Sequence, residues 1–109
     1  MEITFLNDEI ESLCANGRVA KKKYGVAVAK KLAQRLVELF AVECASELVA
    51  GHLHPLSGDR AGQFSMRLDG AYRLVFASTI QPPPTKPDGG IDWNSVTKIT
   101  ILSVEDYHA

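Results

Sequence analysis

The spacing of apolar residues changes near the middle of the chain. From residue 24 to residue 42, apolar residues recur every three or four positions, which is the period of an amphipathic helix. In residues 64–68 and 72–76, large apolar residues stand at every second position, which is the period of strands with one buried face. The helical stripe expected to be buried consists of Ala29, Leu32, Ala33, Leu36, Leu39 and Phe40. The pattern therefore predicts an α+β fold, with helices packed on one face of a β-sheet.

Shorter patterns predict two elements before this helix. A strand is expected around Ile3 and Phe5, where apolar and polar residues alternate. Asp8 and Glu11 have the spacing of a capping box, which predicts the start of a first helix, and Gly17 is placed to end it. Two helices are thus expected in the N-terminal half.

The C-terminal half is expected to hold a loop and a last strand. A helical turn is predicted at 46–49, and a strand at 96–104. Between the strands, residues 79–95 are rich in proline and glycine, which do not fit the interior of a sheet. We expect this segment to be an insertion loop within a single domain that spans residues 1–109.

The register of the hairpin within residues 64–76 follows from one-sided burial. A two-residue loop would place Met66 opposite Arg73, which mixes apolar and charged side chains on one face. A three-residue loop that ends at Gly70 places Met66 opposite Tyr72 and separates the two kinds of residue. We predict the three-residue loop, with Gly70 at positive φ. Arg67 and Arg73 then share the sheet face that the helices leave uncovered.

Composition narrows the class of protein. Hydrophobic residues make up 46% of the chain and charged residues 23%, as in an ordinary soluble globular protein. The uncharged apolar runs are much shorter than the ~18 residues that a membrane helix needs, and the N-terminus does not have the pattern of a secretory leader. We expect a cytoplasmic protein without a membrane segment. Cys14 and Cys44 are too few for a zinc site and are expected to be reduced core residues.

Charge is unevenly distributed, although the net charge is only −1. No acidic residue occurs between Glu11 and Glu38, and this window contains Arg18, Lys21, Lys22, Lys23, Lys30, Lys31 and Arg35. We interpret it as a surface that faces a polyanion, with Lys30, Lys31 and Arg35 on the polar side of the longer helix. The alternative is an ordinary solvated helix face.

A small set of side chains has the chemistry for a reaction at a phosphate. Imidazole and phenol groups transfer protons, and guanidinium groups stabilise negative charge. No phosphate-binding glycine loop, zinc-protease motif or paired cysteines accompany them, so we expect no metal and no cofactor. The candidates are His54, Arg67, Arg73, Asp106, Tyr107 and His108. Asp59 and Arg60 have suitable side chains too, but we interpret them as a turn with a surface ion pair.

Two segments of the chain resemble a known family. The run from His54 to Phe76, which begins His-Pro-Leu-Ser-Gly-Asp-Arg, and the ending Val104-Glu-Asp-Tyr-His are similar to the HigB-type toxins of the RelE/ParE superfamily. The resemblance implies a RelE-like fold, with two N-terminal helices on one face of a small antiparallel sheet. It also implies the toxin of a type II toxin–antitoxin system.

The resemblance further implies an activity and its partners. Such toxins enter the A site of the small ribosomal subunit and cut mRNA there, by attack of a ribose 2′-hydroxyl on the adjacent phosphate without metal. The implied partners are the ribosome with its mRNA and a HigA-like helix-turn-helix antitoxin.

Residue roles are also implied by the resemblance. Arg73 would stabilise the transition state, and Arg67 would hold the RNA backbone. Tyr107 and His108 would transfer protons, with Asp106 orienting one of them. His54 is a second candidate for proton transfer.

One position departs from the family pattern. Relatives commonly have lysine where this chain has Ser57, and serine cannot supply a cation. This departure leaves open a weakened homologue that only binds its antitoxin. A ParE-like inhibitor that blocks DNA gyrase by binding is a third reading.

Overall fold

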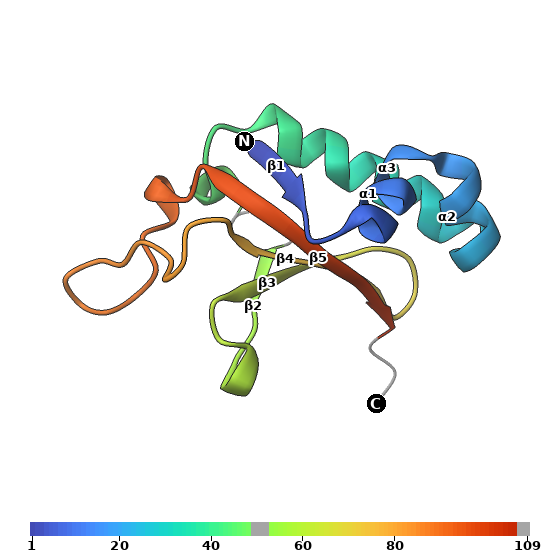
Figure 1. Cartoon of the computed structure of the whole chain (residues 1–109). Helices are drawn as coiled ribbons and strands as arrows, with labels where there is room; N and C mark the ends of the chain where they lie inside the picture. The colour runs from blue at the N-terminus through green and yellow to red at the C-terminus, as the bar shows by residue number, and fades with distance from the viewer. Residues whose placement is uncertain (49–52, 107–109) are drawn as a thin grey trace.

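The computed structural model describes residues 1–48 and 53–106 of the chain (Figure 1). Three α-helices lie on one side of a five-stranded sheet, which confirms the α+β class. The helices are α1 (Asp8–Ala15), α2 (Gly17–Tyr24) and α3 (Val26–Ala41). The strands are β1 (Glu2–Phe5), β2 (Leu53–Pro55), β3 (Gln63–Arg67), β4 (Tyr72–Ser78) and β5 (Lys98–Asp106), and they lie in the order β1-β5-β4-β3-β2.

The core fills the space between the helical layer and the sheet. Because side chains alternate along a strand, one face of each strand enters this core and the other faces away from the helices. The largest buried side chains of the core are Leu32, Leu39, Phe64, Met66, Leu74, Phe76, Ile99 and Ile101. We call the opposite face, which the helices do not cover, the outer face of the sheet.

The N-terminal half contains three helices among the described residues, where the sequence predicted two. Asn7 caps α1 by accepting a hydrogen bond from the Ile10 amide at 2.9 Å, so the helix starts one residue before the predicted capping box. Asn16 caps α2 in the same way, and Gly17 begins that helix instead of ending its predecessor. Gly25, at φ +90°, separates α2 from α3.

Helix α3 is rotated relative to the predicted stripe. Ala33 and Phe40 are exposed, whereas Arg35 is buried with only 7% of its surface accessible. The Arg35 guanidinium donates from Nε to the Arg67 carbonyl at 3.0 Å and from Nη1 to both carboxylate oxygens of Glu38. A charged residue reaches the buried side of a helix because these three bonds satisfy it.

The sheet is mixed, and the prediction of a purely antiparallel sheet is wrong. β1 runs parallel to β5, with Glu2 opposite Lys98 and Phe5 opposite Ile101. Parallel neighbours need a long crossover connection, and here the rest of the chain between the two strands supplies it. Alternation within a strand carries no information about the direction of a partner that is distant in the sequence.

The β3–β4 hairpin keeps its predicted faces but shifts its register. Met66 lies opposite Leu74, two residues from the predicted partner, and the Leu68 amide donates to the Tyr72 carbonyl at 2.9 Å. The loop still has an odd number of residues, and Gly70 has φ +61°, as predicted. A shift of two preserves the face of every side chain, which is the property that burial selects.

The rest of the second half agrees with the prediction in outline. The last strand is displaced by two residues from the predicted range, and residues 45–47 form a short helical turn. The segment 79–95 contains no strand, and its Trp93 packs on Phe64 with ring centroids 4.7 Å apart. This loop is therefore wrapped against the core rather than detached from it. No helix in the described residues has the length and apolar character of a membrane span.

Candidate functional site

Strand register brings three of the predicted site residues onto the outer face. Arg67 of β3 lies directly opposite Arg73 of β4, and Glu105 of β5 lies on the other side of Arg73. His54 of β2 lies opposite Ser65, one step along the same face. Strands are about 4.8 Å apart and residues about 3.3 Å apart along a strand, and His54 is two strands and two residues away from Arg73. The two backbones are therefore about 12 Å apart, a span that two side chains approaching one ligand can cover.

The two arginines form a like-charged pair across adjacent strands. Directly opposed like charges destabilise a sheet, because their side chains stand about 5 Å apart and repel each other. Arg67 is exposed and Arg73 half-buried, so the charge of this pair is accessible from solvent. Such a pair fits a surface that receives an anion, since a bound phosphate removes the repulsion.

An arginine–carboxylate ion pair adjoins these two arginines, because Glu105 is also the strand neighbour of Arg73. Arg60, in the short 3₁₀ helix at Gly58–Arg60, binds Glu105 with two parallel hydrogen bonds of 2.9 and 2.6 Å. Arg60 follows β2 in the chain and Glu105 is on β5, and in the order of the sheet β4 and β3 lie between these two strands. The bridge therefore ties the segment that contains Ser57 to the last strand.

The electrostatics of Glu105 follow from these contacts. The hydrogen bonds from Arg60, together with one from the Ser103 hydroxyl, hold the pKa of the Glu105 carboxyl below its usual range, against a smaller opposing effect of burial. Glu105 is thus ionised at neutral pH. Its negative charge offsets part of the positive charge that Arg60 and Arg73 bring to this face.

Asp106 does not share this face. It lies opposite Tyr72, whose ring packs edge-on against Tyr24 of α2 at 5.2 Å, so the register assigns Asp106 to the side of the helices. A strand turns successive residues to opposite faces, so Asp106 and Glu105 diverge at the end of β5. The predicted role of Asp106, which is to orient Tyr107 or His108, stays a prediction. Tyr107 and His108 lie outside the described residues.

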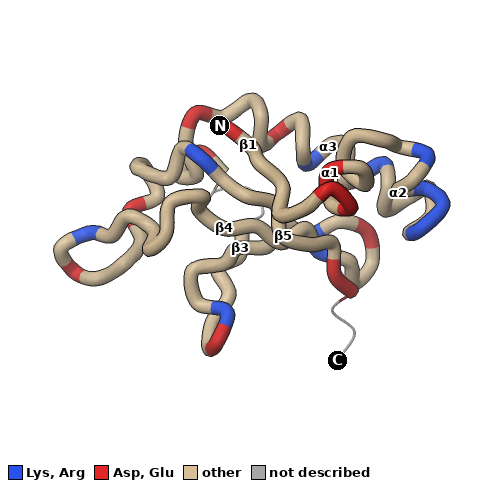
Figure 2. Tube along the Cα trace, viewed as in Figure 1, with Lys and Arg blue, Asp and Glu red and all other residues tan. Residues whose placement is uncertain are grey.

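The predicted basic surface of α3 is only partly present. Lys30 is exposed and Lys31 half-buried, and both line a hollow between α3 and the hairpin loop at Asp69. Arg35 is internal, so its predicted role in binding RNA is wrong. Figure 2 shows the densest group of basic residues on α2, where Arg18 and the three consecutive lysines are exposed.

The outward side of α3 is largely apolar. Val26, Val37 and Phe40 are 65%, 67% and 58% exposed, and Ala33 between them is exposed as well. Their spacing of seven, four and three residues places them on one line along the helix. We call this line the apolar seam of α3; Lys30 is the basic residue within it.

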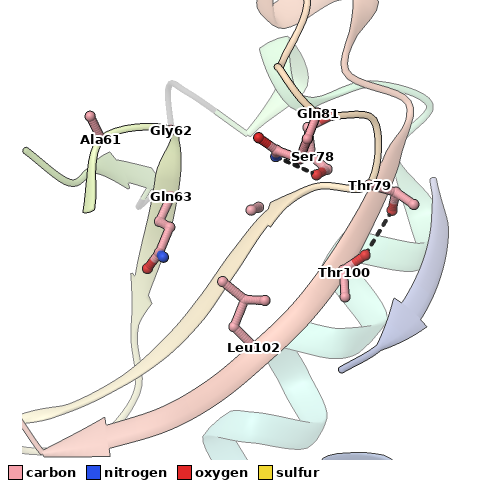
Figure 3. A pocket seen from close by; sticks show the side chains of 9 residues that line it. Ala61, Gly62, Gln63, Ser78, Thr79, Gln81, Thr100 and Leu102 are labelled. Atoms are coloured by element: carbon pink, nitrogen blue, oxygen red, sulfur yellow. Dashed lines mark hydrogen bonds between the residues drawn. The ribbon is translucent and has the colours of Figure 1, made fainter. Parts of the chain in front are cut away.

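The far end of the outer face contains a pocket of about 330 Å³ (Figure 3). Ala77 of β4 lies at its base between Gln63 of β3 and Thr100 of β5, and Thr79 and Gln81 extend its wall. None of its lining residues is charged. The outer face thus has one charged end and one neutral polar end.

Other chemistry is limited within the described residues. No group of three or more His, Cys, Asp or Glu side chains is arranged to hold a metal ion there. Burial raises the pKa of the Cys14 thiol to about 11, so it stays protonated at neutral pH and is a poor nucleophile.

Comparison with known proteins identifies the fold. No protein-family model matches the chain, and no curated protein matches its sequence. Among solved structures, a YoeB/ParE toxin from Agrobacterium tumefaciens matches with a TM-score of 0.58 and 14% identity over 99% of this chain and 100% of that one. The chain therefore has the fold of that toxin.

Sequence reasoning missed Glu105 as a member of the site, and it set Arg60 aside as part of a surface turn with an ion pair. Asp59-Arg60 looks like a surface turn, and Glu105 looks like the residue before the candidate tail. The sequence held a partial signal for Glu105. Because residues alternate between the two faces of a strand, Glu105 is expected on the same face as Ser103. Only the folded sheet pairs two residues that are 45 positions apart.

Proposed function

We propose that this protein is the toxin of a type II toxin–antitoxin system and acts in the cytoplasm as a ribosome-dependent, metal-independent mRNA endonuclease. The observation that carries the proposal is the opposed pair Arg67 and Arg73 on the outer face of the sheet, in a chain that has the fold of a YoeB/ParE toxin. The HigB-like motifs around His54 and Arg73 supply the choice of reaction.

The reaction requires three kinds of group. A base removes the proton of the ribose 2′-hydroxyl, a cation stabilises the extra charge on the phosphorane, and an acid protonates the leaving 5′-oxygen. Arg73 is the proposed cation, and Arg67 holds the neighbouring backbone. His54 and the tail residues Tyr107 and His108 are the proposed proton-transfer groups. Glu105 orients Arg60, since both its oxygens are engaged by that guanidinium.

The test is cleavage of mRNA on programmed ribosomes. Removing a charge-stabilising donor from such a site typically lowers the rate about 10²- to 10³-fold, and we expect this loss for Arg73→Ala. Arg18→Ala is the matched control, because it removes an exposed arginine from α2. Equal rates for the Arg73 and Arg18 variants would contradict the assignment of Arg73.

A second candidate function is inhibition of DNA gyrase by binding. The name of the structural neighbour includes ParE, and the fold alone does not separate the two activities. Intact mRNA on ribosomes together with blocked supercoiling by gyrase would select this function. Neither effect would select a homologue that only binds its antitoxin.

Ser57 decides how active the proposed nuclease is. It is exposed at the start of the 3₁₀ helix that carries Arg60, so a lysine side chain can be accommodated there. We expect Ser57→Lys to increase cleavage by supplying the cation that relatives have. Unchanged cleavage in an active protein would mean that another group, such as Arg60, has replaced it.

We further propose that the apolar seam of α3 is the surface that an antitoxin covers. Val37 and Phe40 are too exposed to stabilise the fold of the chain by itself. A partner helix with the same spacing of apolar residues would bury them. Lys30 in the seam favours a partner that carries acidic residues at its margin. A HigA-like helix-turn-helix protein is the proposed partner. Lys30 and Lys31 are the proposed contacts to ribosomal RNA when the antitoxin is absent.

A further inference from the structure

The neutral end of the outer face has a fixed pattern of hydrogen-bonding groups. Three threonine hydroxyls form a chain: Thr79 to Thr100 at 3.0 Å, and Thr100 to Thr4 at 2.9 Å (Figure 3 shows the first of these). Thr4 also lies 3.4 Å from the Ile99 carbonyl. Each hydroxyl has one proton and two lone pairs, so in each of the two threonine pairs either hydroxyl can be the donor.

Thr79 is the member of this chain that a ligand in the pocket can reach. A hydroxyl oxygen has two lone pairs, so Thr79 can accept a hydrogen bond while it stays bonded to Thr100. Thr79 is exposed and Thr100 half-buried, so the acceptor stands at the wall of the pocket. The threonine chain therefore presents an acceptor to a ligand at Thr79.

Two glutamines complete the pattern. Gln63 accepts a hydrogen bond from Arg60 Nε at 3.1 Å, which requires its carbonyl oxygen and leaves its amide nitrogen as a donor. Gln81 donates to the Ser78 carbonyl at 2.7 Å, which requires its nitrogen and leaves its oxygen as an acceptor (Figure 3). The partners thus fix the orientation of both amides. The amide nitrogens keep N–H donors for a ligand, two on Gln63 and one on Gln81. The pocket therefore presents these donors beside the acceptor oxygens of Gln81 and Thr79, and none of its lining residues is charged.

The pocket lies in line with the arginine pair. Ala77 follows Arg73 by four residues on the same face of β4, a distance of about 13 Å at ~3.3 Å per residue. Its volume of about 330 Å³ is at the lower end of the ~300–1,000 Å³ typical of small-molecule sites. An uncharged polar pocket of this size suits a flat heterocycle and not a phosphate.

We propose that this pocket binds one base of a single-stranded RNA whose backbone lies on Arg67 and Arg73, and that it selects bases with an exocyclic amino group over uracil. The acceptors of Gln81 and Thr79 would receive the amino protons, and the Gln63 amide would donate to the neighbouring ring nitrogen or carbonyl. This inference rests on the proposed function, because it takes RNA as the substrate.

The test measures binding of short RNAs that cannot be cleaved. Two ten-nucleotide probes with 2′-O-methyl ribose, oligo(C) and oligo(U), differ in the amino group and have little structure of their own. Fluorescence anisotropy at low salt gives the affinity of each for the full chain. We expect about tenfold tighter binding of oligo(C), the effect of one good pair of base contacts.

Variants connect the preference to the pocket. Ala77→Met fills the pocket, and Gln81→Leu removes an acceptor from an exposed position, so the second variant is available if the first unfolds. Both are expected to bring the affinity ratio close to one while leaving the salt dependence of binding unchanged. Ala41→Met, at an exposed position at the end of α3, is the control and should keep the ratio.

The possible results separate this inference from the proposed function. Equal binding of the two probes by the wild-type chain overturns the base pocket and leaves the nuclease proposal standing. A preference for oligo(C) in a protein that cuts no mRNA on ribosomes supports the pocket and removes the nuclease. Absence of binding to either probe overturns the pocket as well.

Discussion

The outer face of the sheet and the outward side of α3 are both uncovered, yet they differ in kind. The first opposes two arginines and adds an arginine–glutamate bridge, whereas the second exposes a line of valine and phenylalanine. The basic window of the sequence pointed to the helix as the charged surface. The fold instead turns Arg35 inward and leaves α3 with an apolar seam. Charge counted along a segment is therefore a poor guide to the charge that a surface presents.

The difference between the two surfaces predicts that they can be disabled separately. Val37→Asp together with Phe40→Asp places charge in the apolar seam and is expected to weaken binding of the antitoxin at least about 100-fold, while mRNA cleavage stays unchanged. The measurement is co-purification and titration with the protein encoded beside the toxin. Ile80→Asp is the control, because Ile80 is 59% exposed on the loop segment. Loss of cleavage with intact antitoxin binding would reverse the assignment of the two surfaces.

A comparison of Arg35 with Lys30, both on α3, separates a cation that stabilises the fold from one that is free to bind a partner. Arg35→Ala removes the side-chain donor to the Arg67 carbonyl and the ion-pair partner of Glu38, and we expect the free energy of unfolding to fall by about 1–3 kcal/mol. Lys30→Ala removes an exposed cation and should change it by less than about 0.5 kcal/mol. Urea unfolding measures both. Similar values for the two variants would mean that Arg35 behaves as a surface residue.

The Arg60–Glu105 bridge on the outer face should respond to pH. Because the bridge lowers the pKa of Glu105 in the folded chain, its stabilisation is complete above the ordinary glutamate value of about 4.3 and is lost as pH falls through the lower folded value. The pair is one-third exposed, so solvent screening limits its contribution to about 1 kcal/mol or less. Glu105→Gln should therefore destabilise the protein at pH 7, and the difference should shrink below pH 4.

Urea unfolding of Glu105→Gln at pH 7, 5 and 3.5 checks this dependence. Glu43→Gln, at another exposed carboxylate, is the control and should show no such trend. A difference that grows toward low pH would have the wrong sign for a stabilising bridge.

The smallest expected effect tests the opposed arginines themselves. Arg67→Thr removes one of two like charges and introduces a residue that favours strands, so we expect unfolding to become harder by about 0.2–1 kcal/mol. Affinity for RNA should fall in the same variant, and its salt dependence should weaken. Stability and binding are measured by urea unfolding and anisotropy. A variant that loses stability would show that Arg67 has a structural role.

The sequence alone was sufficient for features that depend on local periodicity. Alternation predicted which side chains of the hairpin share a face, and Gly70 was assigned its positive φ. The register was wrong by two residues, because any even shift satisfies one-sided burial equally well. Helix α2, which lies between the two predicted helices, was missed because it is too short and too charged to produce an apolar stripe of its own.

The tertiary structure decided which residues are neighbours in the folded chain. The parallel pairing of β1 with β5, the burial of Arg35 and the Arg60–Glu105 bridge each join residues that are distant in the sequence or assign a face that periodicity leaves ambiguous. The sequence determined the α+β class, the alternation that puts Arg67 and Arg73 on one face and the chemistry available there. It did not determine how helix α3 is rotated or that Asp106 turns to the helices, because these depend on which contacts bury the most apolar surface in the assembled fold.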